Sequence, residues 1–202
     1  MNTYDLGVLK CHFNQNNTMT TDIHKVVDHA YRLVYITRNV AHHRSLNSFR
    51  DNFNQTYWIL ISNNFLDVAI LEWCKVFGST SDATHWTTNV LDETTFRTGL
   101  FRKLKVTKDE WIAYRERIKT YRDKVIAHYD SNSTVIDHPD FCLALKACFY
   151  YYDMLISQLK RGSISTSYPE SLDDYYEESL AQAKVFSETA YKATKSLDDS
   201  DC

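Results

Sequence analysis

Residues 56–78 read TYWILISNNFLDVAILEWCKVFG, and this stretch decides the fold class of the 202-residue chain. Its apolar residues recur at helical spacing, and Gly78 supplies a stop signal. The apolar face is too broad for a helix that lies on a protein surface. We therefore expect a long, largely buried helix that begins near Ser48 and ends at Phe77.

The composition of the whole chain agrees with a helical fold. It contains 44% hydrophobic and 24% charged residues but only 4 Gly and 2 Pro, which disfavours a many-stranded β-sandwich. A chain of this length can bury roughly two-thirds of its unfolded surface in a core of its own. The sequence thus predicts an all-α fold, an up-and-down helical bundle with an additional C-terminal helix.

Further helices are predicted on both sides of this stretch. Thr107 and Glu110 form a capping box, which marks a helix start at residue 108. Residues 79–91 are rich in turn-forming residues and are expected to form a loop. The other helices are expected over 21–40, 92–104, 108–128, 139–162 and 170–195. The bundle would then span 1–162, and 163–202 would form a linker and a helical arm with a frayed tail.

Charge and cysteine content limit the possible function. The net charge of −3 gives no overall attraction to nucleic acid, so any RNA contact must be local. Five scattered cysteines without a CxxC pair indicate reduced thiols and a cytoplasmic protein. No signal peptide and no window of about 20 apolar residues is visible, so we expect neither secretion nor a membrane span.

The stretch RDKVIAHYD at residues 122–130 carries the most specific motif. It resembles the signature of the HEPN superfamily. In this signature an Arg is followed directly by a polar residue, and four to six residues in all separate the Arg from a His. Here Asp123 is the polar residue, and five residues separate Arg122 from His128. Within the superfamily the stretch is similar to abortive-infection proteins of the AbiU type. The resemblance extends from about Ile59 to Asp130.

The resemblance implies a HEPN-like bundle and a metal-independent endoribonuclease, active as a toxin or phage-defence effector. It implies RNA as the substrate, no cofactor and a homodimer. A further possibility is a toxin that is kept silent by an antitoxin encoded beside it. His128 would be the general acid and base, because an imidazole titrates near neutral pH. Arg122 would hold the charge that grows on the phosphate, because a guanidinium cannot lose its proton.

Helix geometry makes this pair awkward within one chain. Six steps of 100° leave Arg122 and His128 roughly 120° apart around an ideal helix. The two side chains converge more easily if the helix loosens near His128, or if two copies share one cleft around a two-fold axis. The second arrangement is the one that the family implies, namely a homodimer with a composite active site.

Several neighbours are candidate supporting residues. Asp123 could orient Arg122 or His128 by hydrogen bonding, and Lys124 shares a helix face with His128. Asp130 could fix the tautomer of the imidazole. Basic side chains upstream would form a local RNA-binding rim because phosphates supply most sequence-independent affinity; these are Arg115 and Arg117.

Other interpretations of the same residues remain open. Arg122 could pair with an acidic neighbour and His128 could cap a helix end, both without catalysis. The chain could also be a non-catalytic HEPN dimer that binds nucleotides or RNA, or a scaffold regulated by a partner protein. The stretch 38–43, RNVAHH, repeats the spacing from Arg to His at the end of the first helix, and we interpret it as a decoy. No metal-binding pattern such as HExxH is present, so no metal is expected.

The aromatic residues 149–152, FYYY, invite an interpretation as a base-stacking surface, but packing is the more common role of such a cluster. Phe149 and Tyr152 align with the apolar face of their predicted helix. Tyr150 and Tyr151 are expected to be partly exposed or to lie at an interface. The four tryptophans are expected to anchor the core or the loops; they are Trp58, Trp73, Trp86 and Trp111.

Overall fold

The computed structural model describes residues 22–49, 56–127, 138–163 and 167–195. Within these ranges the protein is all-α, with six α-helices and no strand, as predicted. The α-helices are α1 (Ile23–Asn47), α2 (Thr56–Phe77), α3 (Glu93–Leu104), α4 (Lys108–Tyr121), α5 (Cys142–Arg161) and α6 (Leu172–Thr194). A short 3-10 helix, η2 (Trp86–Thr88), precedes α3, and a π-helix, η3 (Arg122–Ala127), follows α4.

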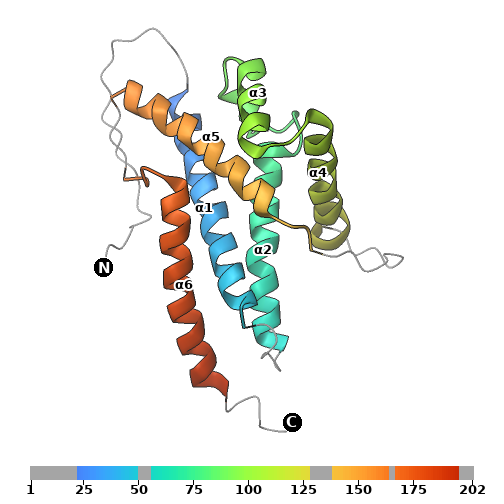
Figure 1. Cartoon of the computed structure of the whole chain (residues 1–202), viewed down its shortest axis with the longest axis vertical. Helices are drawn as coiled ribbons and strands as arrows, with labels where there is room; N and C mark the ends of the chain where they lie inside the picture. The colour runs from blue at the N-terminus through green and yellow to red at the C-terminus, as the bar shows by residue number, and fades with distance from the viewer. Residues whose placement is uncertain (1–21, 50–55, 128–137, 164–166, 196–202) are drawn as a thin grey trace.

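Helix α1 is the central element of the bundle. It packs antiparallel to α2 and also along α6, while α5 crosses these helices obliquely (Figure 1). The apolar residues of α1 recur every three or four positions, and they are almost completely buried: Val26, Ala30, Leu33, Ile36 and Val40. The spacing that predicts this helix therefore also predicts its buried face.

An aromatic cluster joins α2 to α4 and to the start of α5. The fully buried ring of Trp73 lies 5.2 Å from that of Phe77, 6.0 Å from Trp111 and 6.3 Å from Tyr114, measured between ring centroids. Edge-on and stacked contacts of this kind hold helices in one orientation. All four tryptophans are at most 8% exposed, which confirms their predicted role as anchors. The cluster fixes α4, the helix that leads into the motif.

Two predicted helix boundaries near Ser48 are wrong. Helix α1 continues to Asn47 instead of ending at residue 40, and Ser48 caps it instead of starting α2. Tertiary contacts explain the extension. The Ser45 hydroxyl donates to Ser187 Oγ on α6 (3.0 Å), and Leu46 packs against Trp58 on α2.

The start of α5 also differs from the prediction. Pro139 was expected in its first turn, yet α5 begins at Cys142. Asp140 accepts the backbone N–H of Cys142 at 2.9 Å, and the Tyr114 hydroxyl donates to the carbonyl of Asp140 at 2.8 Å. These bonds fold residues 138–141 back onto α4 before the helix starts, which a linear pattern does not reveal.

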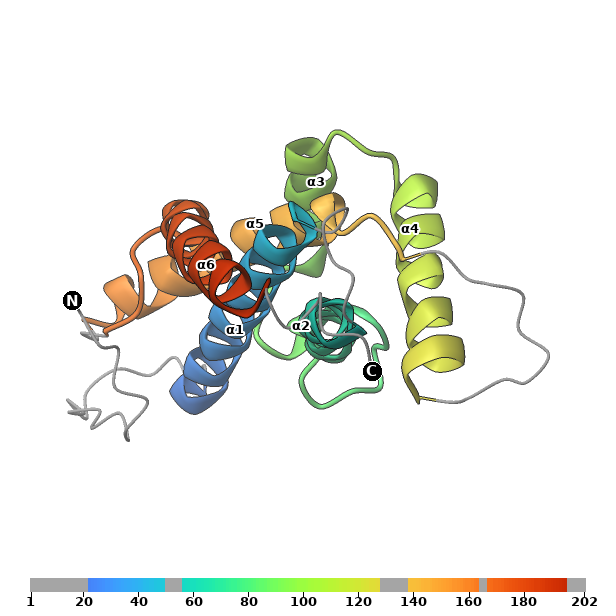
Figure 2. The ribbon, with the colours of Figure 1, turned by 90° about the horizontal axis from the view of Figure 1, so that it is seen from below.

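The helix predicted over 108–128 is α-helical to Tyr121 and continues as the π-helix η3 to Ala127, while the remaining boundaries agree closely with the predictions. Thr107 and Glu110 form the predicted capping box, with bonds of 2.7 Å and 3.2 Å between side chain and backbone N–H. Gly162 caps α5, and the loop after α2 contains only the short η2. Figure 2 shows α6 and α4 on opposite sides of the molecule, with α2 between them.

Candidate functional site

Arg122 lies where α4 changes into the π-helix η3. Its Nε donates to Asp123 Oδ1 at 2.7 Å, and its Nη2 lies 2.7 Å from the same oxygen. The Arg122 side chain is 25% exposed, so the guanidinium is held in place and still reaches solvent. This bond with Asp123 raises the pKa of Arg122 above its usual value, which keeps the positive charge permanent. The hydrogen bond predicted between Asp123 and Arg122 is therefore present.

The inner side of Arg122 faces the end of α2. The thiol of Cys74 is fully buried there, and burial raises its pKa to about 11, against the opposing effect of the Arg122 charge. A thiol with such a pKa stays protonated at neutral pH and is a poor nucleophile. Cys74 therefore lies next to Arg122 as a protonated thiol and offers no covalent chemistry.

Helix η3 loosens the chain across the motif. Residues 122–127 form i→i+5 hydrogen bonds, a widened turn that is rare and often found at functional sites. The prediction that the helix could loosen near His128 therefore agrees with the structure as far as Ala127. His128 and Asp130 lie outside the described residues. The widened turn covers the residues that separate Arg122 from His128 in the sequence.

The other basic candidates lie on different faces of α4 and η3. Arg115 is two turns before Arg122 and shares its face, whereas two steps of 100° turn Arg117 roughly 160° away from Arg115. The structure therefore does not bring Arg115 and Arg117 together as one rim. Lys124 is exposed on η3, and no ion pair of Lys124 with a described residue is present.

The histidines of the second stretch with this motif spacing, residues 38–43 on α1, are engaged in contacts with α2. The His42 ring stacks on Phe65 at 5.0 Å, and burial lowers its pKa. His43 Nδ1 donates to the carbonyl of Ser62 at 2.8 Å. Both imidazoles thus connect α1 to α2, which favours the interpretation of this stretch as structural.

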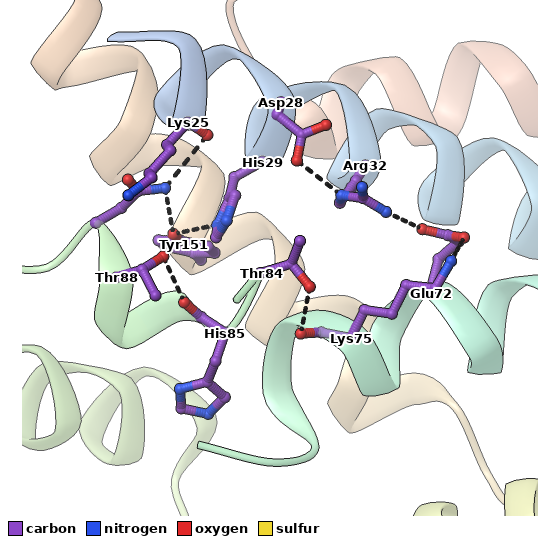
Figure 3. A network of polar contacts seen from close by, with 11 residues as sticks. Lys25, Asp28, His29, Arg32, Glu72, Lys75, Thr84, His85, Thr88 and Tyr151 are labelled. Carbon is purple, nitrogen blue, oxygen red and sulfur yellow. Dashed lines mark hydrogen bonds and ion pairs between the residues drawn. The ribbon is translucent and has the colours of Figure 1, made fainter. Parts of the chain in front are cut away.

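A separate polar network lies in the core at the other end of α1 (Figure 3). The ring of His29 bonds through Nδ1 to the hydroxyl of Tyr151 at 2.7 Å, and Asn89 Nδ2 donates to the same hydroxyl at 3.5 Å. Tyr151 has no exposed surface, so the expectation that it would be partly exposed or interfacial is wrong. Its hydroxyl finds partners inside the core, which allows complete burial.

Beside this network, Arg32 joins two carboxylates. It lies 2.9 Å from Asp28 and 2.7 Å from Glu72, and Glu72 also pairs with Lys75 (Figure 3). The charges along this seam between α1 and α2 are therefore matched. The neighbouring pocket is only about 150 Å³, which is small for a ligand site.

The sequence pattern does not predict one cluster of three polar side chains near Arg122. The Tyr121 hydroxyl donates to Asp67 Oδ1 at 3.2 Å, and it lies 2.8 Å from His138 Nδ1. These three residues come from α4, α2 and the segment before α5. Because Tyr121 is 17 positions from His138 and 54 positions from Asp67 in the sequence, no local spacing connects the three residues. Only the return of residues 138–141 onto α4 brings them together.

Two further observations concern the described residues as a whole. They contain no group of three or more His, Cys, Asp or Glu side chains arranged to hold a metal ion. None of their helices combines the length and the apolar character needed to cross a membrane. Comparisons with protein-family models, with curated proteins and with solved structures found no match to this chain.

Proposed function

We propose that the protein is a metal-independent endoribonuclease of the HEPN type, acting in the cytoplasm as a toxin or phage-defence effector. The observation that carries the proposal is Arg122 at the start of the widened turn η3, fixed by Asp123 and partly open to solvent. A fixed guanidinium that solvent can reach is suited to binding phosphate. The HEPN-like motif at residues 122–130 supplies the histidine.

The reaction is an intramolecular transesterification. The 2′-oxygen of a ribose attacks the adjacent phosphorus, His128 accepts the hydroxyl proton, and the bond from phosphorus to the 5′-oxygen breaks. An imidazolium then returns a proton to the leaving 5′-oxygen, so the products are a 2′,3′-cyclic phosphate and a 5′-hydroxyl. Arg122 stabilises the extra negative charge of the pentavalent transition state.

The reaction needs both a base and an acid, and Arg122 and His128 are separated around an ideal helix. Both features favour a homodimer as the active unit. Two copies around a two-fold axis would contribute two Arg122 and two His128 side chains to one cleft. A protein of this kind would harm its own cell, so a cognate antitoxin is part of the proposal.

The test is cleavage of single-stranded RNA by the full chain, its Arg122→Ala variant and its His128→Ala variant, with and without a chelator. Both variants should lose at least about a hundredfold in rate, because each removes a group that acts in the transition state. Arg102→Ala, on the exposed side of α3, is the matched control and should cleave like the wild type.

Wild-type rates in both variants, or loss of cleavage on adding chelator, would refute the proposal. RNA binding without any turnover would instead favour a non-catalytic HEPN dimer. Mass analysis of the cleaved ends completes the test, since a 3′-phosphate formed without a cyclic intermediate would exclude attack by the 2′-hydroxyl.

A further inference from the structure

A pocket of about 460 Å³ lies between α4 and the segment that leads into α5. Its lining includes Arg117, Ile118, Tyr121, His138 and Pro139. Ligand pockets in proteins typically measure roughly 300–1,000 Å³ and combine an apolar wall with a few polar groups. The reaction proposed above uses none of these side chains.

The charges around the pocket leave one cation available. Arg117 lies 5.7 Å from the centroid of the Tyr114 ring, and among the described residues no carboxylate is within ion-pair distance of its guanidinium. Among the acidic lining residues, Glu116 pairs with Lys119 at 3.0 Å. Asp140 accepts the N–H of Cys142, which lowers the pKa of its carboxyl, and the nearby charges of Arg44 and Arg117 lower this pKa further without forming an ion pair among the described residues. A guanidinium stacked on an aromatic ring keeps its N–H donors free for an anion.

His138 is oriented by the other side of the pocket. Because the Tyr121 hydroxyl donates its proton to Asp67, the short contact to His138 requires Nδ1–H of the imidazole as the donor. This assignment of protons follows from the hydrogen-bond network. It leaves Nε2 as the second polar atom of His138, and no described residue bonds to it. Tyr121 is thus a positioning residue for His138.

We infer that this pocket binds one nucleotide of an RNA strand, with its phosphate held by Arg117 and by Nε2–H of His138 in the imidazolium form, in which both ring nitrogens carry a hydrogen. The apolar wall formed by Ala113 and Pro139 would contact the sugar or base. The inference rests on the proposed function and names the place where the substrate binds beside the reacting bond. Tyr121 directly precedes Arg122, so the pocket and the reactive end of α4 can hold neighbouring nucleotides of one strand.

A nucleoside phosphate can come from RNA or from a free nucleotide, and one binding experiment distinguishes them. The full chain is titrated against a fluorescent single-stranded RNA with 2′-O-methyl groups, which it cannot cleave by 2′-hydroxyl attack. AMP and adenosine then serve as competitors. We expect the RNA to bind, and AMP to compete better than adenosine, because the phosphate is the group that Arg117 and His138 recognise.

Two substitutions remove the proposed phosphate contacts. Arg117→Met and His138→Gln should each weaken RNA binding by about tenfold, the usual effect of losing a hydrogen bond to a charged group. Arg102→Met, on the exposed side of α3, is the matched control and should bind RNA like the wild type. Circular dichroism on every variant separates loss of a contact from loss of the fold.

Tyr121→Phe tests positioning, since it keeps the ring and removes the hydroxyl. The preference for AMP over adenosine should fall, whereas the binding of adenosine should stay unchanged. A variant that weakened both ligands equally would show that Tyr121 acts only by packing, and this outcome would overturn its role.

Wild-type RNA affinity in both Arg117→Met and His138→Gln would overturn the inference. It would also fail if AMP bound and the RNA did not displace it, because the pocket would then take a free nucleotide. These outcomes are separate from failure of the proposed function. Loss of the pocket contacts lowers affinity for the uncleavable RNA, whereas the catalytic proposal depends on the cleavage rate of His128→Ala.

Discussion

Asp123 orients the side chain of Arg122, the residue that we propose binds phosphate. Asp123 holds Nε and Nη2 of Arg122 on a single carboxylate oxygen, both at 2.7 Å. The guanidinium has further N–H groups that point elsewhere and can meet a phosphate. The pair is half-exposed on the Asp123 side, so we assign it an orienting role and little stabilisation of the fold.

Asp123→Asn should therefore slow RNA cleavage by about ten- to a hundredfold without unfolding the protein. The amide keeps the shape of the side chain but no longer holds the guanidinium as a charge pair, and small misplacements of a catalytic group are costly. Asp109→Asn, in the exposed first turn of α4, serves as the control. If Asp123→Asn cleaved RNA as fast as the wild type while Arg122→Ala did not, Asp123 would have no part in the site.

Two buried histidines give the fold a predictable sensitivity to acid. His29 and His85 are each 1% exposed, and burial lowers the pKa of both from 6.5 to about 4. Between these values the unfolded chain binds protons that the folded protein does not bind, so the stability that is present above pH 6.5 is lost as the pH falls toward 4.

Lowering the pH from 7.5 to 5.5 should reduce the free energy of unfolding by about 1 kcal/mol for each of these histidines. Urea denaturation at several pH values measures the effect. His29→Gln should remove its share of the pH dependence, whatever it does to the stability at pH 7.5. A free energy of unfolding that stays constant over this range would contradict the burial of neutral imidazoles.

The elements of the fold were predicted better than their ends. The periodic apolar residues of α1 and the capping box at Thr107 gave correct helices because both signals are local. The end of α1 depends on Ser45 and Leu46 meeting α6 and α2, and the start of α5 depends on Tyr114 holding Asp140. Such contacts join distant parts of the chain, so a single sequence read locally does not contain them.

The candidate site was likewise predicted only in part, where the signal in the sequence is local. The sequence identified Arg122 and Asp123 through the motif, and the structure shows them in contact. It did not identify Tyr121 or His138, because their contact depends on the path of residues 138–141. The π-helical form of residues 122–127 was also not specified, since the motif only suggested that a looser helix would help.

Deleting Val125 tests the importance of the widened turn. Removing one residue should let the rest of η3 adopt ordinary α-helical bonding, which closes the widened turn that follows Arg122. Val125 is 44% exposed, so little packing is lost. We expect RNA cleavage to disappear while the thermal unfolding temperature changes little.

Val125→Ala is the control for this deletion, since it shortens the same side chain and keeps the number of residues. It should cleave RNA like the wild type. Full activity in the deletion variant would mean that the π-helix has no role in placing the residues that follow Arg122.

The whole molecule combines a rigid bundle with a motif at one side. The aromatic contacts of Trp73 fix α4 against α2, and α6 lies on the opposite side of the molecule (Figure 2). The end of α4 is thus held by the core while η3 stays accessible at the surface.

If the active unit is a homodimer, light scattering should give a mass about twice the 23.7 kDa of one chain. A strictly monomeric protein that cleaves RNA would remove the composite site from the account.

The central claim is that Arg122 and His128 from two subunits form one RNA-cleaving site, and mixing two inactive variants tests it most directly. Arg122→Ala and His128→Ala are unfolded together, refolded together and assayed for cleavage of single-stranded RNA. In an equal mixture about half of the dimers contain one intact Arg122 and one intact His128, on different chains. The account predicts that each variant alone is inactive and that the mixture regains part of the wild-type cleavage rate, because the one intact His128 can accept the proton of the 2′-hydroxyl and return it to the 5′-oxygen. A mixture as inactive as its two components, or full activity in His128→Ala alone, would contradict it.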